Sequence, residues 1–385
     1  MDFELSEEQK AFKKMAKDFA EREIAPIAKE YDEQEKFPYE VVQKMAQVGL
    51  LGVIIPQEYG GLGLDLLTLV LILEELAYSS LGIAVAATLS GTLPATVVLK
   101  AGSKEQKQRY LPSICKGEKV FCVAAVEPNA GSDGGNIQTT AVMNDDQWTI
   151  NGNKLFITNG TVSDTAFVLV QTDRSKSTKG LGIIAVDRNI PGFSVRKYTS
   201  KLGLRSCDLG DLRFDNCRVP KECLVGEIGK GLQNAMAGIS NMRLSIAAYS
   251  NGISQYCLDT CIKYTQERQQ FGKPIASFQL IQESIADMYV QIEASKYLCY
   301  SAAYDKEKGK PFNRKVSAAK YFAAETAIKV AAKAVKIHGA YGTVSDYAIE
   351  RYYRDAVVLS IPGGTEEVHK LTIGRDLLGI DALSR

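Results

Sequence analysis

The chain has 385 residues, of which 45% are hydrophobic and 24% are charged, and its formal net charge is +1. These values are typical of a globular protein that buries a large core without disulfides, and they exclude a low-complexity chain. A balance so near neutrality also argues against a nucleic-acid-binding surface, so we expect no nucleic-acid partner.

The first third of the chain is predicted to be helical. Ser6 followed by Gln9 is a capping box that starts a helix, and Pro38 suits the first turn of a second helix. The segments 66–77 and 81–101 are apolar nearly all round, as buried helices are. We therefore predict an N-terminal α-helical domain over residues 1–120.

The hydrophobic pattern changes its period in the middle of the chain. Residues 145–152 predict a hairpin with a tight turn, and the turn residues come at short intervals. The predicted strands lie at 120–126, 167–171, 182–187, 193–198 and 212–214. We predict that residues 121–228 form a β domain, an antiparallel barrel or sandwich.

The helical period returns at residue 229 and lasts to the end. Long Ala-rich segments at 231–267, 277–306 and 313–337 have the lengths of helices in a bundle. We predict that residues 229–385 form a C-terminal helical bundle. The fold class is therefore α+β, in the order helix, sheet, helix.

Two residue counts restrict the chemistry. With only two histidines, His338 and His369, and with no C-x-x-C pair among eight cysteines, we expect no metal site. We interpret the cysteines as buried free thiols and the histidines as packing groups at helix ends. The first residues, 1–8, lack the regions of a signal peptide, and the apolar stretch 66–73 is too short to span a bilayer. These features predict a cytoplasmic protein without membrane insertion.

Four segments rich in small residues carry the candidate chemistry. Residues 127–135 follow a strand directly, and they predict either a plain loop or one whose backbone N–H groups approach a ligand. Arg268, at the end of a long helix, complements the helix dipole or pairs with a phosphate. Residues 338–342 end a helix with room for a flat ligand. Thr365 is the expected N-cap of the last helix, where a polar ligand can bind.

Taken in order, these segments resemble the flavin-dependent acyl-CoA dehydrogenase family over nearly the whole chain. The matching motifs are Glu-Pro-x-Ala-Gly-Ser-Asp at 127–133, Phe156 to Gly160, Arg268 to Gly272, Phe278-Gln279, Arg351 to Asp355 and Gly364-Thr365. The resemblance implies an N-terminal helical domain, a middle β-barrel or sandwich and a C-terminal four-helix bundle. It also implies an oxidoreductase with FAD as cofactor, an acyl-CoA substrate, a homotetramer and an electron-transfer flavoprotein as electron acceptor.

The resemblance also assigns residues to the two ligands. The positions that match FAD contacts are Val123, Val126, Ser132, Phe156, Ile157, Thr158, Arg268, Phe271, Gln279, Lys336, Gly339, Ala340, Thr365 and Glu367. Thr158 is expected near the reactive N5 of the flavin, and Lys336 to Ala340 are expected to come from a neighbouring subunit. The positions that match substrate contacts are Ser132, Ser177 and Arg243, with Gly364 beside the acyl group.

The sequence departs from the family at the catalytic base. The Glu that usually precedes the Gly-Thr of the last loop is Gly363 here, and the second position at which some members place it is Met242. Neither residue takes up a proton, so the catalytic residue is unknown from the sequence. Within the expected pocket segment 82–95, Gly91 is the position at which we look for a vacated carboxylate.

Four interpretations of this departure remain open. If the substrate is already α,β-unsaturated, its acidic hydrogen lies at the γ-carbon, and Gly363 makes room for a ring. This favours an alicyclic substrate of the cyclohexene-carboxyl-CoA type, oxidised by 1,4-elimination in alicyclic or aromatic acid metabolism. The alternatives are an enoyl-CoA reductase, an acyl-CoA desulfinase and a non-catalytic FAD-binding scaffold.

Overall fold

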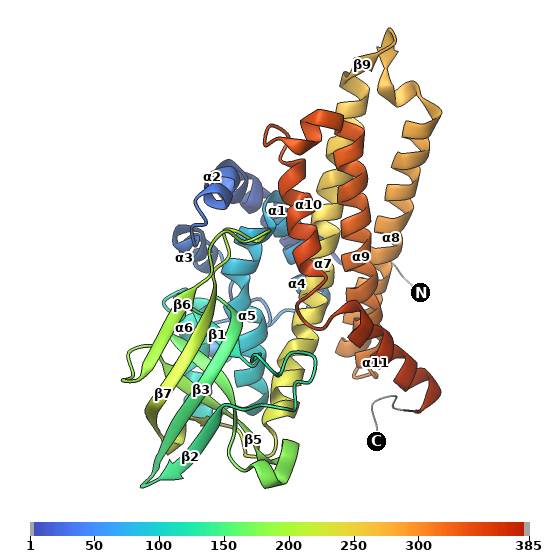
Figure 1. The fold of residues 1–385 in the computed structure, drawn as a ribbon. Helices are drawn as coiled ribbons and strands as arrows, with labels where there is room; N and C mark the ends of the chain where they lie inside the picture. Colours follow the sequence, from blue (N-terminus) through green and yellow to red (C-terminus); the bar gives the residue numbers. More distant parts are fainter. Residues whose placement is uncertain (1–3, 381–385) are drawn as a thin grey trace.

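The computed structural model describes residues 4–380, which form a helical part, a β-sheet and a second helical part (Figure 1). The first part contains α1 (Glu7–Phe19), α2 (Ala28–Glu33), α3 (Tyr39–Gln47), α4 (Leu66–Ser79), α5 (Leu81–Ala101) and α6 (Lys104–Cys115). The predicted capping box is confirmed, because Ser6 Oγ accepts the N–H of Gln9 at 3.1 Å and the Gln9 side chain accepts the N–H of Ser6 at 3.0 Å.

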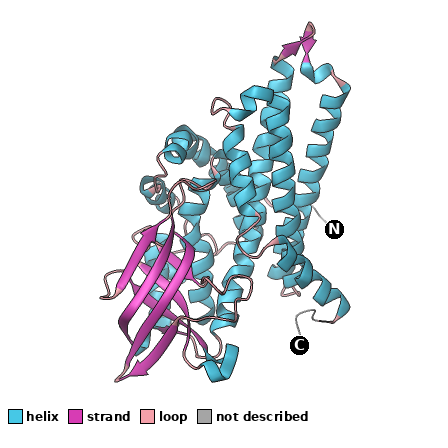
Figure 2. Cartoon of the chain, in the orientation of Figure 1, coloured by secondary structure: helices cyan, strands magenta, loops and turns pink. Residues whose placement is uncertain are grey.

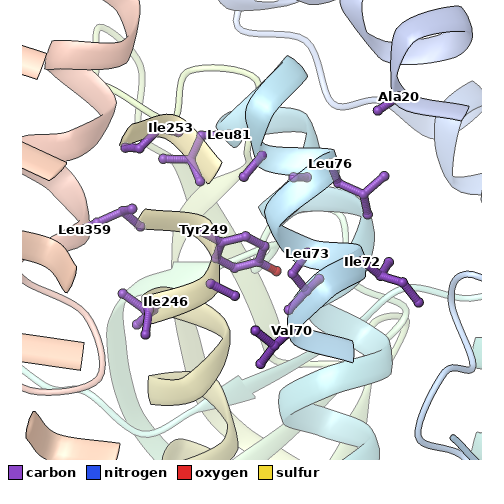
Figure 3. Close-up of a cluster of buried hydrophobic side chains, with 14 of the residues drawn as sticks. Ala20, Val70, Ile72, Leu73, Leu76, Leu81, Ile246, Tyr249, Ile253 and Leu359 are labelled. Atoms are coloured by element: carbon purple, nitrogen blue, oxygen red, sulfur yellow. The ribbon is translucent and has the colours of Figure 1, made fainter. Parts of the chain in front are cut away.

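Helices α4 and α5 lie in the interior, as their apolar surfaces predict. Leu73 and Leu76 of α4 belong to the same buried cluster as Ile246 and Tyr249 of a long C-terminal helix, and Figure 3 shows part of this cluster. Helix α5 is long and apolar enough to cross a membrane, but 94% of its most apolar window is buried inside the protein. Its hydrophobicity therefore reflects its place in the core.

The middle of the chain forms one mixed sheet, which Figure 2 shows on one side of the molecule. Its strands are β1 (Phe121–Ala124), β2 (Thr140–Asn144), β3 (Gln147–Thr158), β4 (Thr165–Gln171), β5 (Leu181–Asp187), β6 (Phe193–Lys197), β7 (Leu209–Pro220) and β8 (Leu224–Val225). The predicted hairpin is the β2–β3 pair, and its turn residues Asp145 and Asp146 have positive φ angles of 46° and 62°.

Most neighbouring strands are antiparallel, as predicted, but β4 also has parallel partners. Strand β1 pairs with β4 in parallel along its whole length, and β2 meets β4 in parallel at the Thr140–Gln171 pair. The chain reaches β4 from β1 through a long connection that already contains the β2–β3 hairpin, and this spacing permits a parallel pairing.

The last part of the chain is a helical bundle around one long helix. Its helices are α7 (Gly231–Glu267), α8 (Gln279–Glu307), α9 (Asn313–His338), α10 (Ile349–Leu359) and α11 (Glu366–Leu378). Helix α7 packs against α4 and α5 on one side and α8 and α9 on the other. A short hairpin, β9 (Gln269–Gln270) with β10 (Lys273–Pro274), forms the tip of the bundle in Figure 1.

The predicted order of helix, sheet and helix is confirmed. The exact domain boundaries, 1–120, 121–228 and 229–385, stay predictions. The eight cysteines carry free thiols, seven of them buried. His338 packs at a helix end as predicted: it is stacked on Tyr264 with ring centroids 4.2 Å apart, and burial lowers its pKa.

Candidate functional site

The ends of β1 and β3 bring two predicted FAD segments together. The N–H of Leu155 donates to the carbonyl of Val126 at 2.9 Å, so the loop after β1 runs beside Phe156. Phe156 has a positive φ of 54° and a side chain that is 56% exposed. Its ring is stacked on Tyr198 with centroids 5.0 Å apart. The two rings give this edge of the sheet an accessible, flat aromatic surface.

A buried ion pair anchors the loop that follows β1. Glu127 Oε1 lies 2.7 Å from Lys154 Nζ, and the same carboxylate accepts the backbone N–H groups of Gln138 and Thr139. Burial alone would raise the pKa of Glu127, but Lys154 and these N–H groups hold it below its usual value. The carboxylate thereby ties the two ends of the loop 127–139 together.

Two of the predicted substrate residues lie on neighbouring exposed loops. Ser132 follows β1, and Ser177 lies in the turn before β5 with a φ of 50°. The loops meet at Gly135, where an added Cβ would stand 3.2 Å from Thr178 Cγ2. An added Cβ at Gly131 would meet nothing within 4 Å, so its backbone is open to a ligand.

The loop between α10 and α11 rests on buried cations. Arg243 Nε donates to the carbonyl of Gly363 at 2.7 Å. Lys320 Nζ donates to the carbonyls of Ser360 and Gly364 at 2.7 and 2.8 Å. Because these carbonyls turn toward the cations, side chains of α7 and α9 determine the path of the loop.

The two positions at which the resemblance expects a carboxylate lie side by side. Gly363 has a φ of 72°, and an added Cβ would stand 3.5 Å from Met242 Cε and 3.4 Å from Arg243 Cγ. Residues 242 and 363 therefore face the same small region, and no titratable carboxylate stands at either of them.

The electrostatic environment of this region is positive. Burial and the charge of Arg243 lower the pKa of Lys320 to about 8. Burial, Arg243 and Lys320 lower the pKa of His369 to about 3, so this imidazole is neutral. Gly364 lies against it, since an added Cβ would stand 3.3 Å from His369 Nε2.

The packing around Gly91 gives no support to a vacated base there. An added Cβ would stand 2.0 Å from the backbone oxygen of Leu51, so a side chain cannot be placed without moving the backbone. Glycine allows α5 to approach the loop after α3 closely at this point. The carboxylate that was sought at Gly91 therefore has no space in this fold.

A second group of predicted FAD residues, from β9 and from the ends of α8 and α9 beside it, lies at the tip of the bundle, away from the sheet in Figure 1. The Phe271 side chain is 92% exposed, and Gln279, Lys336, Gly339 and Ala340 are also exposed. Arg268 lies over the ring of Tyr341 at 5.9 Å, which brings the β9 end and the end of α9 together. One chain thus holds its predicted FAD residues in separate groups.

Thr365 and Glu367 begin the last helix. Thr365 is the N-cap of α11, as predicted, but its side chain makes no capping hydrogen bond. Glu367 has its pKa lowered by its own backbone N–H and by the Thr365 side chain.

Sequence analysis did not identify Tyr198, Lys320 or the contact of His369 with the loop. A signal existed for Lys320, because it is a single cation in the Ala-rich segment 317–324. Tyr198 lies after a short strand and carries no comparable signal. The contact of His369 depends on how α11 docks.

Comparisons with known proteins agree with this architecture. The family models of the acyl-CoA dehydrogenase N-terminal, middle and C-terminal domains match residues 6–118, 122–217 and 229–378. The 3-(aryl)acrylate reductase of Clostridium sporogenes is 42% identical over 373 residues, which are 97% of this chain and 99% of that protein. CarC, a subunit of the caffeyl-CoA reductase–Etf complex of Acetobacterium woodii, is 41% identical over 97% of this chain and 99% of its own.

Solved structures show the same fold. Butyryl-CoA dehydrogenase from Megasphaera elsdenii superposes with a TM-score of 0.95 at 37% identity, over 98% of this chain and 100% of that chain. A glutaryl-CoA dehydrogenase from Mycobacterium smegmatis, solved in complex with FADH2, gives a TM-score of 0.94 at 27% identity, over 99% and 97% of the two chains. The chain belongs to the acyl-CoA dehydrogenase family, and it is an oxidoreductase of CH–CH bonds in acyl-CoA thioesters.

The cofactor is FAD, and the residues present fit it. The exposed Phe156–Tyr198 stack suits the flat ring system, and the open backbone at Gly131 allows close approach. Arg268 makes no ion pair within residues 4–380, so its guanidinium is available to a pyrophosphate.

Proposed function

We propose that this acyl-CoA dehydrogenase family member acts on α,β-unsaturated acyl-CoA thioesters, without an enzymic carboxylate at the α-carbon. A single observation carries the proposal: Gly363 and Met242 face one region, and neither side chain can exchange a proton. A saturated substrate needs a base there, because its α-proton must be removed. An unsaturated substrate has no such proton.

The residues of the chain have separate tasks in this scheme. FAD, when bound, accepts or supplies the hydride. The sheet edge at Phe156 and Thr158 would bind the flavin, and Ser132 and Ser177 would bind the CoA part. Arg243 and Lys320 would favour negative charge that develops on the thioester oxygen.

Within this class we propose an alicyclic substrate of the cyclohexene-carboxyl-CoA type. In a 1,4-elimination the proton leaves the γ-carbon, and the hydride leaves the ring carbon on the other side of the α-carbon. The glycine at position 363 supports this proposal, because it leaves room beside Met242 that a Glu side chain would fill. The residue that accepts the γ-proton is unassigned.

Reduction of an enoyl-CoA is a second candidate, and the relatives favour it. The relatives from Clostridium sporogenes and Acetobacterium woodii are both named as reductases. In this direction the β-carbon receives a hydride, and the α-carbon receives a proton from water. The positive charges of Arg243 and Lys320 would stabilise the negatively charged enolate intermediate. A carboxylate at residue 363 would repel this enolate, and the chain has none there.

The flavin absorbance of the anaerobic holoenzyme distinguishes these reactions. We expect cyclohexene-carboxyl-CoA to bleach the oxidised flavin and butyryl-CoA to leave it unchanged. If the protein is a reductase, crotonyl-CoA or an aryl-acrylyl-CoA will reoxidise the reduced flavin. Bleaching by butyryl-CoA would overturn the proposal. A flavin that responds to no thioester would favour a scaffold, and loss of sulfinate from a sulfinopropionyl-CoA would identify a desulfinase.

The Gly363→Glu variant tests the observation that carries the proposal. We expect it to gain bleaching by butyryl-CoA, because it restores a carboxylate beside Arg243. Gly363→Gln has nearly the same shape and strain without the charge, so it is the matched control and should stay silent with butyryl-CoA.

We also propose that the protein is a cytoplasmic homotetramer that exchanges electrons with an electron-transfer flavoprotein. The separate positions of the Phe156 and Phe271 groups support an oligomer, because a second subunit can bring the two groups to one FAD. Helix α8 exposes apolar side chains that a subunit would cover, such as Leu280 and Val290. CarC of Acetobacterium woodii belongs to a complex with Etf, which supports the partner. Sedimentation of the holoenzyme would test the homotetramer. Electron transfer between the reduced holoenzyme and a purified electron-transfer flavoprotein would test the partner.

A further inference from the structure

A small polar cavity lies where the three parts of the chain meet. Its walls come from α2, from Arg205 in the loop before β7, and from α10 with the turn that precedes it. We call it the junction cavity, and its volume is about 230 Å³. Its lining contains three carboxylates and four cations, and the cations are Lys29, Arg205, Arg351 and Arg354. The charge of the lining is therefore positive by one.

The carboxylates of the junction cavity are bound to two of its cations. Arg354 lies 2.7 Å from Asp32 Oδ2 through a terminal nitrogen and 2.8 Å from Glu350 Oε2 through Nε. The third carboxylate, Glu33, is exposed at the rim and lies 3.9 Å from Lys29. None of these contacts involves Arg205 or Arg351, so the two remaining arginines have no carboxylate of their own.

Arg205 and Arg351 keep donors that have no partner. Arg205 uses only Nε, which donates to the carbonyl of Lys201 at 2.8 Å, and its terminal nitrogens are unbonded within residues 4–380. Arg351 is 8% exposed and forms no ion pair within those residues. The ring of Tyr352 lies beside it, with the centroid 5.4 Å from the guanidinium carbon, and its single hydroxyl can accept only a small part of the guanidinium N–H groups. Buried polar groups are nearly always paired, so these free donors point to a ligand.

A buried carboxylate near Arg351 does not take up these donors. Asp355 follows one turn later on α10 and is 2% exposed. Its Oδ1 accepts the backbone N–H of Leu204 at 2.6 Å. Asp355 and Asp32 favour the charged form of Arg351 through space, without a direct ion pair to it. They reduce the cost of burying the cation and leave its N–H groups free.

The size and the donors of the junction cavity indicate the class of ligand. A volume of about 230 Å³ is far more than the roughly 30 Å³ of one water, and less than the roughly 300–1,000 Å³ of pockets for drug-sized molecules. The ligand therefore has few atoms. Arginine N–H groups suit the oxygens of carboxylates and phosphates. Two arginines from different elements favour a phosphate, because its oxygens point in tetrahedral directions and not in one plane.

We propose that the junction cavity binds a phosphate group through Arg205 and Arg351. The anion would bridge the loop 198–208, which joins two strands of the sheet, to α10 of the bundle. Tyr198 of this loop stacks on Phe156, so the anion would also steady the surface assigned to the flavin. The inference goes beyond the proposed function, because it holds for any thioester substrate.

Isothermal titration calorimetry of the holoenzyme tests the inference. The buffer contains no phosphate or sulfate, and potassium chloride keeps the ionic strength constant. The probes are inorganic phosphate and glycerol 3-phosphate, which offer the same group free and as an ester. We expect binding of inorganic phosphate. Tighter binding of the ester would support the site and identify a phosphate ester as the natural source. No binding of either probe would overturn the inference.

Variants locate the binding within the molecule. Arg205→Gln and Arg351→Gln should each weaken it about tenfold or more, because each removes charged donors to the anion. Arg218→Gln removes an exposed cation of β7 outside the junction cavity and should keep the affinity. If Arg351→Gln does not fold, Arg205→Gln decides, because Arg205 lies in a loop and is only partly buried. Unchanged binding in a folded cavity variant, or an equal loss in Arg218→Gln, would overturn the inference.

Discussion

Two buried lysines of this protein have opposite surroundings. Lys154, at 0% exposure, lies beside Glu127 in the sheet, with 2.7 Å between nitrogen and oxygen. Lys320, at 1% exposure, lies in the helical bundle and contacts only backbone carbonyls, with the cation Arg243 close by.

The difference indicates two uses of a buried cation. The Glu127–Lys154 pair is complete, because its carboxylate also accepts two backbone N–H groups, and it holds a loop in place. Lys320 and the neighbouring Arg243 instead bond to backbone carbonyls and form no ion pair with a carboxylate within residues 4–380. Removing one partner of a buried ion pair is destabilising, because it leaves the other charge buried without compensation, whereas removing a cation that has no anion leaves no such charge behind.

The largest effect is expected from breaking the complete pair. Lys154→Met leaves the Glu127 carboxylate buried without its cation, so we expect the free energy of unfolding to fall by about 3–5 kcal/mol. Urea denaturation of the holoenzyme measures it. The double variant Lys154→Met/Glu127→Gln removes both charges and should cost less than the single one. A single variant that costs no more than the double would contradict the role of the pair.

A smaller loss is expected at Lys320. Lys320→Met leaves no acid unpaired and relieves repulsion with Arg243, but it removes hydrogen bonds to Ser360 and Gly364. We expect a loss of about 1–2 kcal/mol in the same urea experiment. If Lys320→Met costs as much as Lys154→Met, the two lysines do not differ in the way that their surroundings indicate.

A further effect concerns pH, and per pH unit it is the smallest of the three. The pKa of His369 is about 3 in the folded protein, against an ordinary value of 6.5. Below pH 6.5 the unfolded chain therefore binds a proton that the folded chain does not, so stability falls as the pH falls toward 3. This contribution is at most about 1.4 kcal/mol per pH unit.

A variant isolates this contribution. Between pH 6.5 and pH 4.5, the free energy of unfolding of His369→Gln should fall less per pH unit than that of the unchanged protein. Lys370→Gln, on the same helix but exposed, should keep the original slope. Identical slopes in His369→Gln and the unchanged protein would show that burial and the neighbouring Arg243 and Lys320 do not hold His369 neutral in the folded protein.

Much of the fold could be predicted from local patterns. Helices α5 and α7 have the bounds that their hydrophobic periods predict, and the β2–β3 hairpin has its turn at Asp145 and Asp146. These features depend on residues that are close in sequence, so a short window contains the information. The parallel partners of β4 were not predicted, because strand order depends on contacts between distant segments.

The candidate site was predictable only as a set of motifs. The segments around Glu127, Phe156 and Arg268 carry recognisable patterns, and the missing Glu at Gly363 is visible in the sequence alone. Gly91 illustrates the limit, because its pattern allowed a vacated carboxylate and its packing against Leu51 does not.

The sequence by itself determined the order of the three parts, the family and the absence of a carboxylate at residues 242 and 363. Only the tertiary structure decided that these two residues meet, and that Arg243, Lys320 and His369 gather under one loop without an acid. The physical reason is that charge and burial depend on distances between α7, α9 and α11, which no short segment of the chain encodes.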